Sequence, residues 1–378
     1  AKRNEVSRKI GEFKKAKQET PAGLANEADV IKTQLEAFNG TTEEAEAKTR
    51  ELLLSIPNLL DASTPLGKTP EDNKVVSEWV PPGRPLDPGF AVKNHVEAGE
   101  ALGLLDIDRA GKLAGSRFAV LKGPLATLER ALIQLMLDTH TREHGYTEIY
   151  PPLLLNAETL TGTGQLPKFE EDLYRMRDEA LYLSPTEEVA LCSLHRDEVI
   201  DESALPVAYT AGCVSFRREA GSYGKDTRGI IRNHQFKNVE LVRFCRPEDS
   251  AAELELIRTH AEAILKKLAI PYRVLALCSG DIGFAAMKTY DLEVWMPGEK
   301  MWREISSCSN CGDFQARRIN VKYKKADGKK EFVHLLNGTG VSVNRMLAAV
   351  LENHQEPDGS VRVPQALRHY LPFERITK

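Results

Sequence analysis

The chain has 378 residues, 42% of them apolar and 28% charged, which is enough for two or three folded units with a sizeable core. This composition excludes a disordered, collagen-like or low-complexity chain. Lys and Arg total 51 against 55 Asp and Glu, so any nucleic-acid contact needs a local basic patch. There is no apolar stretch of 18 residues and no leader-like start, so we expect no membrane span and no secretory signal. Six cysteines are too few for a disulfide framework and favour a reducing, cytoplasmic setting.

Residues 1–60 are expected to form helices only. Val6, Ile10 and Phe13 follow one helical stripe, the Pro21 region breaks it, and a second stripe with alternating spacings of 4 and 3 runs on to Ile56. This pattern predicts an antiparallel coiled-coil hairpin with helices at 3–18 and 26–54. At 1.5 Å per residue these helices would be about 24 and 43 Å long. The mismatch leads us to expect that the natural protein has further residues before this point.

Charge is divided between the two expected helices. Residues 2–17 hold seven basic residues against two acidic ones, and residues 18–51 hold eight acidic residues against three basic ones. Two interpretations stay open: ion pairing across the hairpin, or a basic face for a phosphate backbone.

Residues 61–90 contain six prolines and are expected to be a linker. Residues 91–378 are expected to form a folded α+β domain. Helices are predicted over 123–144, 248–268 and 340–354, and short strands around 146–150, 181–183, 207–217, 229–244, 272–278, 289–295 and 301–306. The strands follow one another as antiparallel hairpins, which disfavours a doubly wound parallel sheet.

The densest group of chemically active residues lies in 214–244, read as strand, polar loop and strand. On the second strand, five residues share parity and would project from one face: Arg232, His234, Phe236, Asn238 and Glu240. Together with Arg217, they indicate a site for an anion and a ring, because Arg binds phosphate bidentately and Phe offers a flat surface. The competing interpretation is a solvated sheet face tied by ion pairs.

Three further segments carry weaker signals. Glu304, followed by Ser306 and Ser307, could hold Mg²⁺ between protein and phosphate oxygens. Cys308 and Cys311 form a single CxxC with no second pair, so no zinc is expected. Thr186 with two following Glu, and the Gly338-Thr339-Gly340 run, are ordinary helix starts when taken alone. The chain has neither a GxxxxGK[ST] loop nor a GxGxxG after a strand. If ATP is bound, neither of these two motifs binds it.

In this order and spacing, these segments resemble the seryl-tRNA synthetase family of class II aminoacyl-tRNA synthetases. Gly145 to Pro152 is similar to motif 1, Phe216 to Glu219 with Arg232 to Phe236 to motif 2, and Gly338 to Arg345 to motif 3. The serine-specific segments are also similar: 163–169, 186–188 and 304–310. The resemblance covers almost the whole chain, including the hairpin.

The resemblance implies a ligase with a seven-stranded antiparallel sheet flanked by helices, preceded by a tRNA-binding arm at 1–60. It implies a homodimer that activates L-serine with ATP and Mg²⁺. The seryl-adenylate would then charge tRNA(Ser), and tRNA(Sec) is expected as a further substrate.

The resemblance also implies residue roles. Arg217 and Arg345 would be catalytic. ATP would be bound by Arg217, Arg218, Glu219, Asn233, Phe236, Glu304, Ile305, Ser306, Ser307 and Arg345. Serine would be bound by Thr186, Glu187, Glu188, Arg217, Glu240 and Thr339. Mg²⁺ would be held through ATP by Glu304 and Ser307, and tRNA by Arg8, Lys9, Lys14 and Lys15.

Two alternatives of other classes remain. A synthetase paralogue could charge a carrier protein or act as a regulator, and a structural coiled-coil protein would not need the Arg, Phe and Glu strand. Serine-dependent exchange of pyrophosphate into ATP separates an adenylate-forming enzyme from a scaffold.

Overall fold

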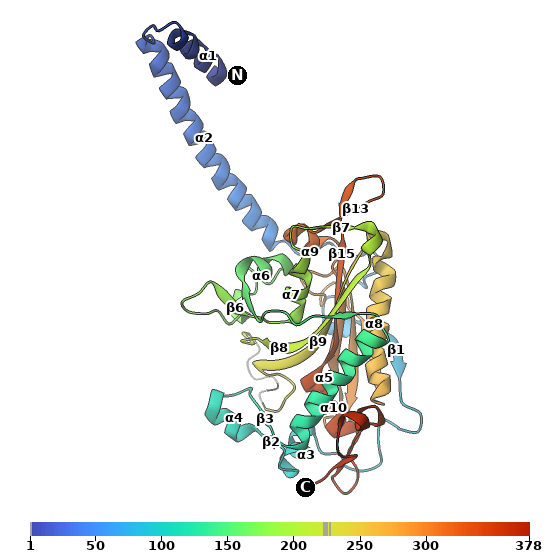
Figure 1. The fold of residues 1–378 in the computed structure, drawn as a ribbon. Coiled ribbons are helices and arrows are strands. Elements are labelled where there is room, and N and C mark those ends of the chain that lie inside the picture. The colour runs from blue at the N-terminus through green and yellow to red at the C-terminus, as the bar shows by residue number, and fades with distance from the viewer. Residues whose placement is uncertain (1, 222–225, 227) are drawn as a thin grey trace. The chain divides into compact units, whose positions relative to one another are not determined.

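The computed structural model describes residues 2–221, 226 and 228–378. Contacts divide the chain into two units, Ala1–Ile56 and Pro57–Lys378, which are described separately (Figure 1). No described helix is both long and apolar enough to cross a bilayer.

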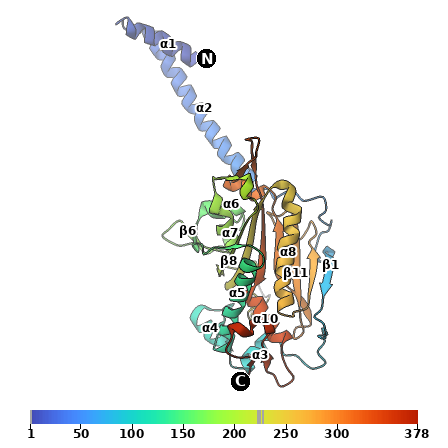
Figure 2. The same ribbon diagram turned by 45° about the vertical axis from the view of Figure 1, so that its right-hand side comes forward.

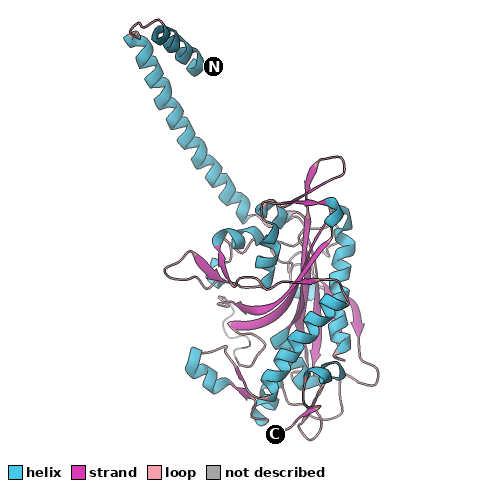
Figure 3. Cartoon of the chain, in the orientation of Figure 1, coloured by secondary structure: helices cyan, strands magenta, loops and turns pink. Residues whose placement is uncertain are grey.

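The first unit is the expected helical hairpin. It consists of α1 (Lys2–Lys15) and α2 (Ala22–Ser55), both shown in cyan in Figure 3. Helix α2 begins at Ala22 instead of residue 26, directly after Pro21, which breaks the helical run between the two helices.

The two helices of the hairpin differ greatly in length. Helix α1 has 14 residues and α2 has 34, or roughly 21 and 51 Å at 1.5 Å per residue. Val6 is buried on α1, whereas no described residue of α2 is buried. Three large apolar residues of the expected seam, Leu35, Phe38 and Leu52, are exposed, and so are Val30 and Leu53 next to it.

The second unit is built on an eight-stranded sheet in the order β1-β10-β11-β12-β15-β9-β8-β4. Seven of these strands form the expected antiparallel sheet, and the short β4 joins β8 in parallel at one edge. The strands are β1 (Lys74–Trp79), β10 (Tyr272–Ala276), β11 (Lys288–Met296), β12 (Met301–Asn310), β15 (His334–Ser342), β9 (Gln235–Cys245), β8 (Val207–Phe216) and β4 (Thr147–Glu148).

Three long helices cover one face of this sheet: α5 (Pro124–Arg142), α8 (Ser250–Lys267) and α10 (Val343–Asn353). Figure 2 shows α5 and α8 on the same side of the strands. Strand β9 illustrates the two faces, because successive side chains alternate. Val239 and Leu241 join the core formed with these helices, whereas Val242 and Phe244 join a second core on the opposite face.

Smaller elements complete the unit. The short helices are α3 (His95–Ala101), α4 (Ile107–Ala114), α6 (Ala157–Thr163), α7 (Glu187–Cys192) and α9 (Phe314–Ile319). Four small sheets join β14 (Lys330–Phe332), β13 (Lys322–Lys324) and β7 (Val199–Asp201); β16 (Val361–Arg362) and β17 (Arg375–Ile376); β2 (Leu105–Asp106) and β3 (Val120–Leu121); and β5 (Leu154–Asn156) and β6 (Leu181–Leu183).

Three local predictions were wrong. The expected linker 61–90 contains β1, which pairs with β10 as the edge strand of the main sheet. Strand β9 begins at Gln235, not at residue 229. The Gly338-Thr339-Gly340 run lies inside β15 and does not start a helix. A Cβ on Gly338 would overlap Ile257, and one on Gly340 would come within 2.9 Å of His140. These glycines therefore let α8 and α5 approach the strand.

Candidate active site

A pocket of about 440 Å³ opens on the sheet face opposite α5 and α8, and the first turn of α10 lines part of it. Phe236, Asn238 and Glu240 project into it from alternate positions of β9, as strand alternation predicts. Other walls come from β12, β15, α10 and the start of α7. Beyond β9 the lining is Thr186, Glu188, Arg217, Glu219, Ile231, Arg232, Asn233, Glu304, Ile305, Ser307, Ser309, Asn337, Thr339, Ser342, Asn344 and Arg345.

Strand alternation does not extend to the residues before β9. Arg232 lines the pocket from the loop and bonds Glu219 at 2.5 Å. His234 does not line it: Nδ1 lies 3.0 Å from the carbonyl oxygen of Arg217, and the ring packs against Phe118. The chain has not yet entered the strand at these positions, so their parity carries no information about the face they occupy.

Arg217 lines the pocket and is held by two contacts. Its Nε donates to the carbonyl of Pro185 at 3.0 Å, and its guanidinium carbon lies 5.1 Å from the centre of the Phe236 ring. These two contacts orient the guanidinium group of Arg217 before any ligand is bound.

Arg345 occupies another wall of the pocket. Its Nη1 donates to the carbonyl of Glu304 at 2.8 Å, and its Nε donates to the carbonyl of Ile231 at 3.3 Å. Asn233 is buried and donates to the carbonyl of Gly229 at 3.1 Å. A flat ring and two guanidinium groups therefore line the same space, which suits a nucleotide.

A cluster of carboxyl groups lies beside Arg217. Glu240 is buried, and its pKa is raised well above the ordinary value, first by burial and then by Glu188 and Glu187. Burial also raises the pKa of Glu188 and raises that of Glu187 to about 7. Grouping acidic side chains in a low-dielectric space is unfavourable without a cation. The arrangement is therefore suited to a positively charged ligand.

Hydroxyl and amide groups surround this cluster. Thr339 pairs with Glu240 across β15 and β9, and its side chain hydrogen-bonds that carboxyl. Thr186 accepts from the backbone N–H of Glu188 at 3.3 Å, so it caps α7 and also lines the pocket. Asn337 donates to Glu188 at 3.0 Å. No role was predicted for Asn337, although its position two residues before Thr339 on one strand could have suggested one.

Glu304 and Ser307 line the pocket from β12. Asp291 lies opposite Ser307 on β11, and the side chains of these two residues hydrogen-bond. Burial, followed by the charge of Glu304, raises the pKa of Asp291 well above its usual range. Its Oδ1 is buried and has no hydrogen-bond partner among the described residues. Oxygen donors with one unpartnered buried carboxyl oxygen fit a hard divalent cation. The sequence analysis considered β12 alone and therefore missed Asp291, which the pairing of β11 with β12 places beside Ser307.

Three residues with expected ligand roles do not line the pocket. Arg218 is exposed, and its backbone N–H donates to the carbonyl of Asp172 at 2.8 Å. Ser306 is buried and donates to the carbonyl of Thr339. Glu187 is buried behind the pocket and accepts from Ser215 at 3.0 Å. Ser306 and Glu187 therefore support neighbouring groups of the site.

The two cysteines of the CxxC pair are buried. Burial raises the pKa of Cys308 to about 12 and that of Cys311 well above its usual value. Cys308 lies near Ser306, and Cys311 accepts from Asn337. Both thiols are therefore held in their neutral form.

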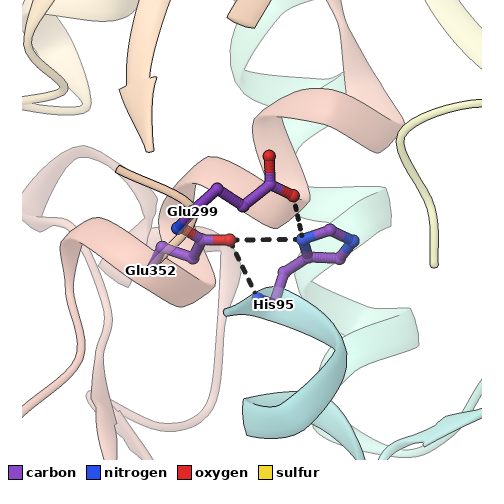
Figure 4. A group of neighbouring side chains, drawn as sticks. All are labelled: His95, Glu299 and Glu352. Atoms are coloured by element: carbon purple, nitrogen blue, oxygen red, sulfur yellow. Dashed lines mark hydrogen bonds and ion pairs between the residues drawn. The ribbon is translucent and has the colours of Figure 1, made fainter. Parts of the chain in front are cut away.

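A separate buried group joins His95, Glu299 and Glu352, whose ligand-type atoms lie within 4.8 Å of one another (Figure 4). Glu352 Oε1 accepts from the backbone N–H of His95 at 2.9 Å and lies 3.2 Å from its Nδ1. Oε2 accepts from the backbone N–H of Gly298 at 2.8 Å. Both oxygens are satisfied by the protein, so this group ties α3 and the β11–β12 turn to α10.

The four expected tRNA contacts lie on α1 and are exposed: Arg8, Lys9, Lys14 and Lys15. Arg8 and Lys9 pair with Glu12 and Glu5 of the same helix at 3.3 and 2.8 Å. Lys2 reaches Glu27 of α2 at 3.1 Å. Within the described residues, no ion pair joins Lys14 or Lys15 to a carboxylate. Pairing across the hairpin is thus limited, and α1 keeps basic groups available.

Two family models match the chain. The model of the seryl-tRNA synthetase N-terminal domain matches residues 1–60, and that of the class II tRNA synthetase core domain (G, H, P, S and T) matches residues 168–354. The serine–tRNA ligase of Nitratidesulfovibrio vulgaris is 52% identical over 377 residues, covering 99% of this chain and 88% of the relative. That of Pelotomaculum thermopropionicum is 50% identical over 98% of this chain and 87% of the relative.

Solved structures agree with these relatives. The seryl-tRNA synthetase of Pyrococcus horikoshii, solved with ATP, has a TM-score of 0.90 and 37% identity, covering 100% of this chain and 88% of its own. The cytoplasmic enzyme of Naegleria fowleri, solved with AMP, has a TM-score of 0.86 and 32% identity over the same shares. The motifs, the sheet and the relatives together show that this chain belongs to the seryl-tRNA synthetase family of class II aminoacyl-tRNA synthetases.

Proposed function

We propose that the pocket activates L-serine with ATP and then transfers the seryl group to tRNA(Ser). By family the chain is a serine–tRNA ligase, and the proposal concerns how its residues act. One observation carries it: buried carboxyl groups lie on one side of Arg217, and the Phe236 ring and the Arg345 guanidinium line the rest of the same pocket. These groups match the ammonium, base and phosphates of the two substrates.

The first step needs no general base, because the carboxylate of serine is already a nucleophile. Its oxygen attacks the α-phosphorus of ATP, a C–O–P bond forms, and pyrophosphate leaves. Arg217, already oriented by Pro185 and Phe236, stabilises the negative charge that builds up on the phosphate oxygens. Catalysis is thus mostly positioning and electrostatic stabilisation.

Phe236 and Arg345 are proposed to hold the two faces of adenine. Glu219 accepts from the exocyclic amine, and Asn233 contributes through its backbone. The hydrogen bonds of Arg345 to the carbonyls of Glu304 and Ile231 support this role, because they fix the guanidinium on the pocket wall before ATP arrives.

Serine is proposed to bind at the carboxyl cluster. Its ammonium is attracted by Glu188 and Glu240, and its hydroxyl is read by Thr339 with support from Thr186. The raised pKa of Glu240 supports this role, since a bound ammonium would relieve the repulsion among the carboxyl groups. A site that hydrogen-bonds a substrate hydroxyl rejects alanine strongly, because its polar groups would be left unpaired.

Mg²⁺ is proposed to be held by Glu304 and Ser307, with Asp291 as a third oxygen donor. When bound with ATP, the ion would neutralise phosphate charge. Mn²⁺ binding in the presence of a non-hydrolysable ATP analogue, followed by electron paramagnetic resonance, tests these residues without turnover. Asp291→Asn should weaken Mn²⁺ binding, whereas Asp327→Asn, in the turn between β13 and β14, should not. Equal Mn²⁺ affinity in Asp291→Asn would exclude the third ligand.

The proposal also covers the roles of the two domains, the partners of the protein and its location in the cell. Residues 1–60 act as a tRNA-binding arm through Arg8, Lys9, Lys14 and Lys15, and residues 91–378 carry the catalytic site. The chain forms a cytoplasmic homodimer and also charges tRNA(Sec). The exposed Tyr150, which is 84% accessible beside the motif 1 strand, supports a dimer surface, and six free buried cysteines support a reducing compartment.

The decisive experiment is serine-dependent exchange of labelled pyrophosphate into ATP. Exchange with serine and none with alanine is expected, and its absence would reject the proposal in favour of a scaffold or regulator. Charging of tRNA(Ser) and tRNA(Sec) transcripts, and sedimentation equilibrium for the dimer, test the extensions one by one.

A further inference from the structure

The buried group of His95, Glu299 and Glu352 does not line the pocket and has no role in the function proposed above. His95 is 2% exposed and begins α3. Its Nδ1 faces the two carboxylates, 3.2 Å from Glu352 Oε1 and 3.5 Å from Glu299 Oε1. Figure 4 shows the other ring nitrogen, Nε2, pointing away from both carboxylates. This second nitrogen is therefore available to another part of the chain.

The Nε2 side of the His95 ring faces the chain that leads into β9. The backbone N–H of Ile230 donates to Nε2 at 3.5 Å. A Cβ on Gly229 would come within 2.5 Å of the same nitrogen, and Gly229 has a φ of +104°, which other residues rarely adopt. The imidazole and this stretch of backbone are thus in direct contact, and glycine at 229 permits it.

The neighbours of His95 decide which ring nitrogen carries the proton. Glu352 is an acceptor, because its two oxygens already accept from the backbone N–H groups of His95 and Gly298. The N–H of Ile230 can only donate. A neutral imidazole therefore carries its proton on Nδ1, directed at Glu352, and offers Nε2 as the acceptor. The carboxylate thus fixes the tautomer that the backbone contact requires.

The segment 229–233 forms part of the wall that is proposed to hold adenine. Ile231 and Asn233 line the pocket. The carbonyl of Ile231 accepts from Arg345 Nε at 3.3 Å, and the side chain of Asn233 donates to the carbonyl of the first residue of this segment at 3.1 Å. The backbone that touches His95 is therefore the backbone that positions these groups.

Helix α10 holds this segment in two ways. Arg345 and Glu352 both belong to α10 and are separated by about two helical turns, so they lie on the same side of the helix. Arg345 contacts the segment directly within the pocket. Glu352 contacts it through His95, which does not line the pocket. One helix thus fixes both the guanidinium and the backbone that this guanidinium touches.

We propose that His95 is a positioning residue for ATP, whose Nε2, held as an acceptor by Glu352, fixes the backbone at Ile230 and thereby the wall that contacts adenine. His95 touches no substrate and acts only through this wall. The inference rests on the proposed function and adds a residue outside the pocket that sets the affinity for one substrate. Serine binding should not depend on it, since the groups assigned to serine lie on α7, β9 and β15.

Two substitutions separate the roles of the two ring nitrogens, because the amide of Asn reaches the position of Nδ1 and that of Gln the position of Nε2. His95→Asn keeps a donor to Glu352 but leaves the buried N–H of Ile230 without its acceptor. The KM for ATP in serine-dependent pyrophosphate exchange should rise by roughly tenfold, the scale of one buried donor left unpaired. His95→Gln restores an acceptor at Ile230 and should keep the KM for ATP close to its original value. The KM for serine should stay constant in both variants.

The matched control is His354→Asn. His354 is also buried and lies 2.8 Å from the carbonyl of Leu268 through Nε2, but neither it nor its partners Leu268 and Arg84 line the pocket. This variant should lower the Tm without changing either KM. Thermal unfolding with and without ATP gives a second readout for variants that are less stable. ATP should raise the Tm of His95→Gln as much as that of the original chain, and that of His95→Asn less.

Three outcomes would overturn the proposal while the function stands. They are an equal rise in both KM values, a rise in His95→Gln as large as that in His95→Asn, and an unchanged KM for ATP in His95→Asn. The first two would show that His95 supports the fold as a whole. Absence of serine-dependent exchange in the unaltered chain would instead reject the proposed function itself.

Discussion

The hairpin and the pocket use charge in opposite ways. On α1, Arg8 and Lys9 are exposed and pair within one helical turn, where each ion pair contributes little because water screens it. In the pocket, Glu240 and Glu188 are enclosed beside Arg217, and their pKa values are displaced. The same residue types therefore serve long-range attraction in one region and short-range recognition in the other.

This difference predicts how each region should respond to change. Exposed charges act together and weaken as salt rises, because their interaction extends over a Debye length. Enclosed charges act singly and depend on geometry and pH, since each lost partner leaves another group unpaired. Single substitutions should be severe in the pocket and mild on the hairpin.

The largest effect is expected at Arg217. Arg217→Lys keeps the charge but loses the planar fork that matches phosphate oxygens. Serine-dependent pyrophosphate exchange should fall by roughly 100-fold or more, on the scale of one lost transition-state donor. Arg273→Lys is the matched control, because Arg273 also packs on a ring and pairs with a carboxylate, Glu293, but does not line the pocket. Exchange near the original rate in Arg217→Lys would contradict the role.

The second effect concerns pH. Because burial and Glu188 raise the pKa of Glu240, this carboxyl is protonated at pH values where exposed carboxylates are ionised. The ammonium of serine requires the ionised form, so binding should release a proton. The KM for serine should therefore rise as the pH falls through the raised pKa, by about tenfold per unit for one proton.

Steady-state exchange measured from about pH 6 to 8.5 checks this dependence. The KM for ATP serves as the internal control, because the ring and the guanidinium groups at that end do not depend on Glu240. Glu240→Gln removes the titrating group and should flatten the profile. A serine KM that is constant across the range would show that the cluster is already ionised without its ligand.

The third effect is smaller and tests specificity. Thr339→Val keeps the shape of the side chain but removes the hydroxyl that bonds Glu240. The KM for serine should rise by about three- to tenfold, the scale of one neutral hydrogen bond, while the KM for ATP changes little. If the ATP value changes instead, Thr339 belongs to the nucleotide end of the pocket.

Much of this site could be predicted from local sequence. Phe236, Asn238 and Glu240 follow from strand alternation alone, because β9 is regular there. The same rule failed for His234, which precedes the strand and faces Phe118. A pattern with period two is informative only where the chain is already paired.

The remaining residues depend on strand neighbours that are distant in sequence. Asp291 joins Ser307 only because β11 pairs with β12, and Asn337 meets Glu188 across 149 positions. Likewise, the glycines of β15 suggested a helix start. They are needed instead because a larger side chain there would overlap Ile257 or His140. These placements depend on how the strands and helices pack together, which the local spacing of residues does not encode.

The smallest effect on chemistry is expected on the hairpin. Replacing Lys9, Lys14 and Lys15 by Ser should leave pyrophosphate exchange intact, because these residues lie in a separate unit from the pocket. Aminoacylation should weaken only a few-fold at moderate salt, as expected for exposed charges. Its dependence on salt should flatten by nearly one unit of log–log slope for each tRNA phosphate that the variant no longer neutralises.

Both reactions should be measured across a salt series, with Lys32→Ser as the control because Lys32 lies on the acidic helix α2 and pairs weakly with Glu36 at 4.0 Å. Equal loss of exchange and aminoacylation in the triple variant would mean that the substitutions unfold the protein. An unchanged salt slope would mean that the basic residues of α1 serve the hairpin itself, as Lys2 does through Glu27. A flattened slope with normal exchange would separate the screened charges of the arm from the enclosed charges of the pocket.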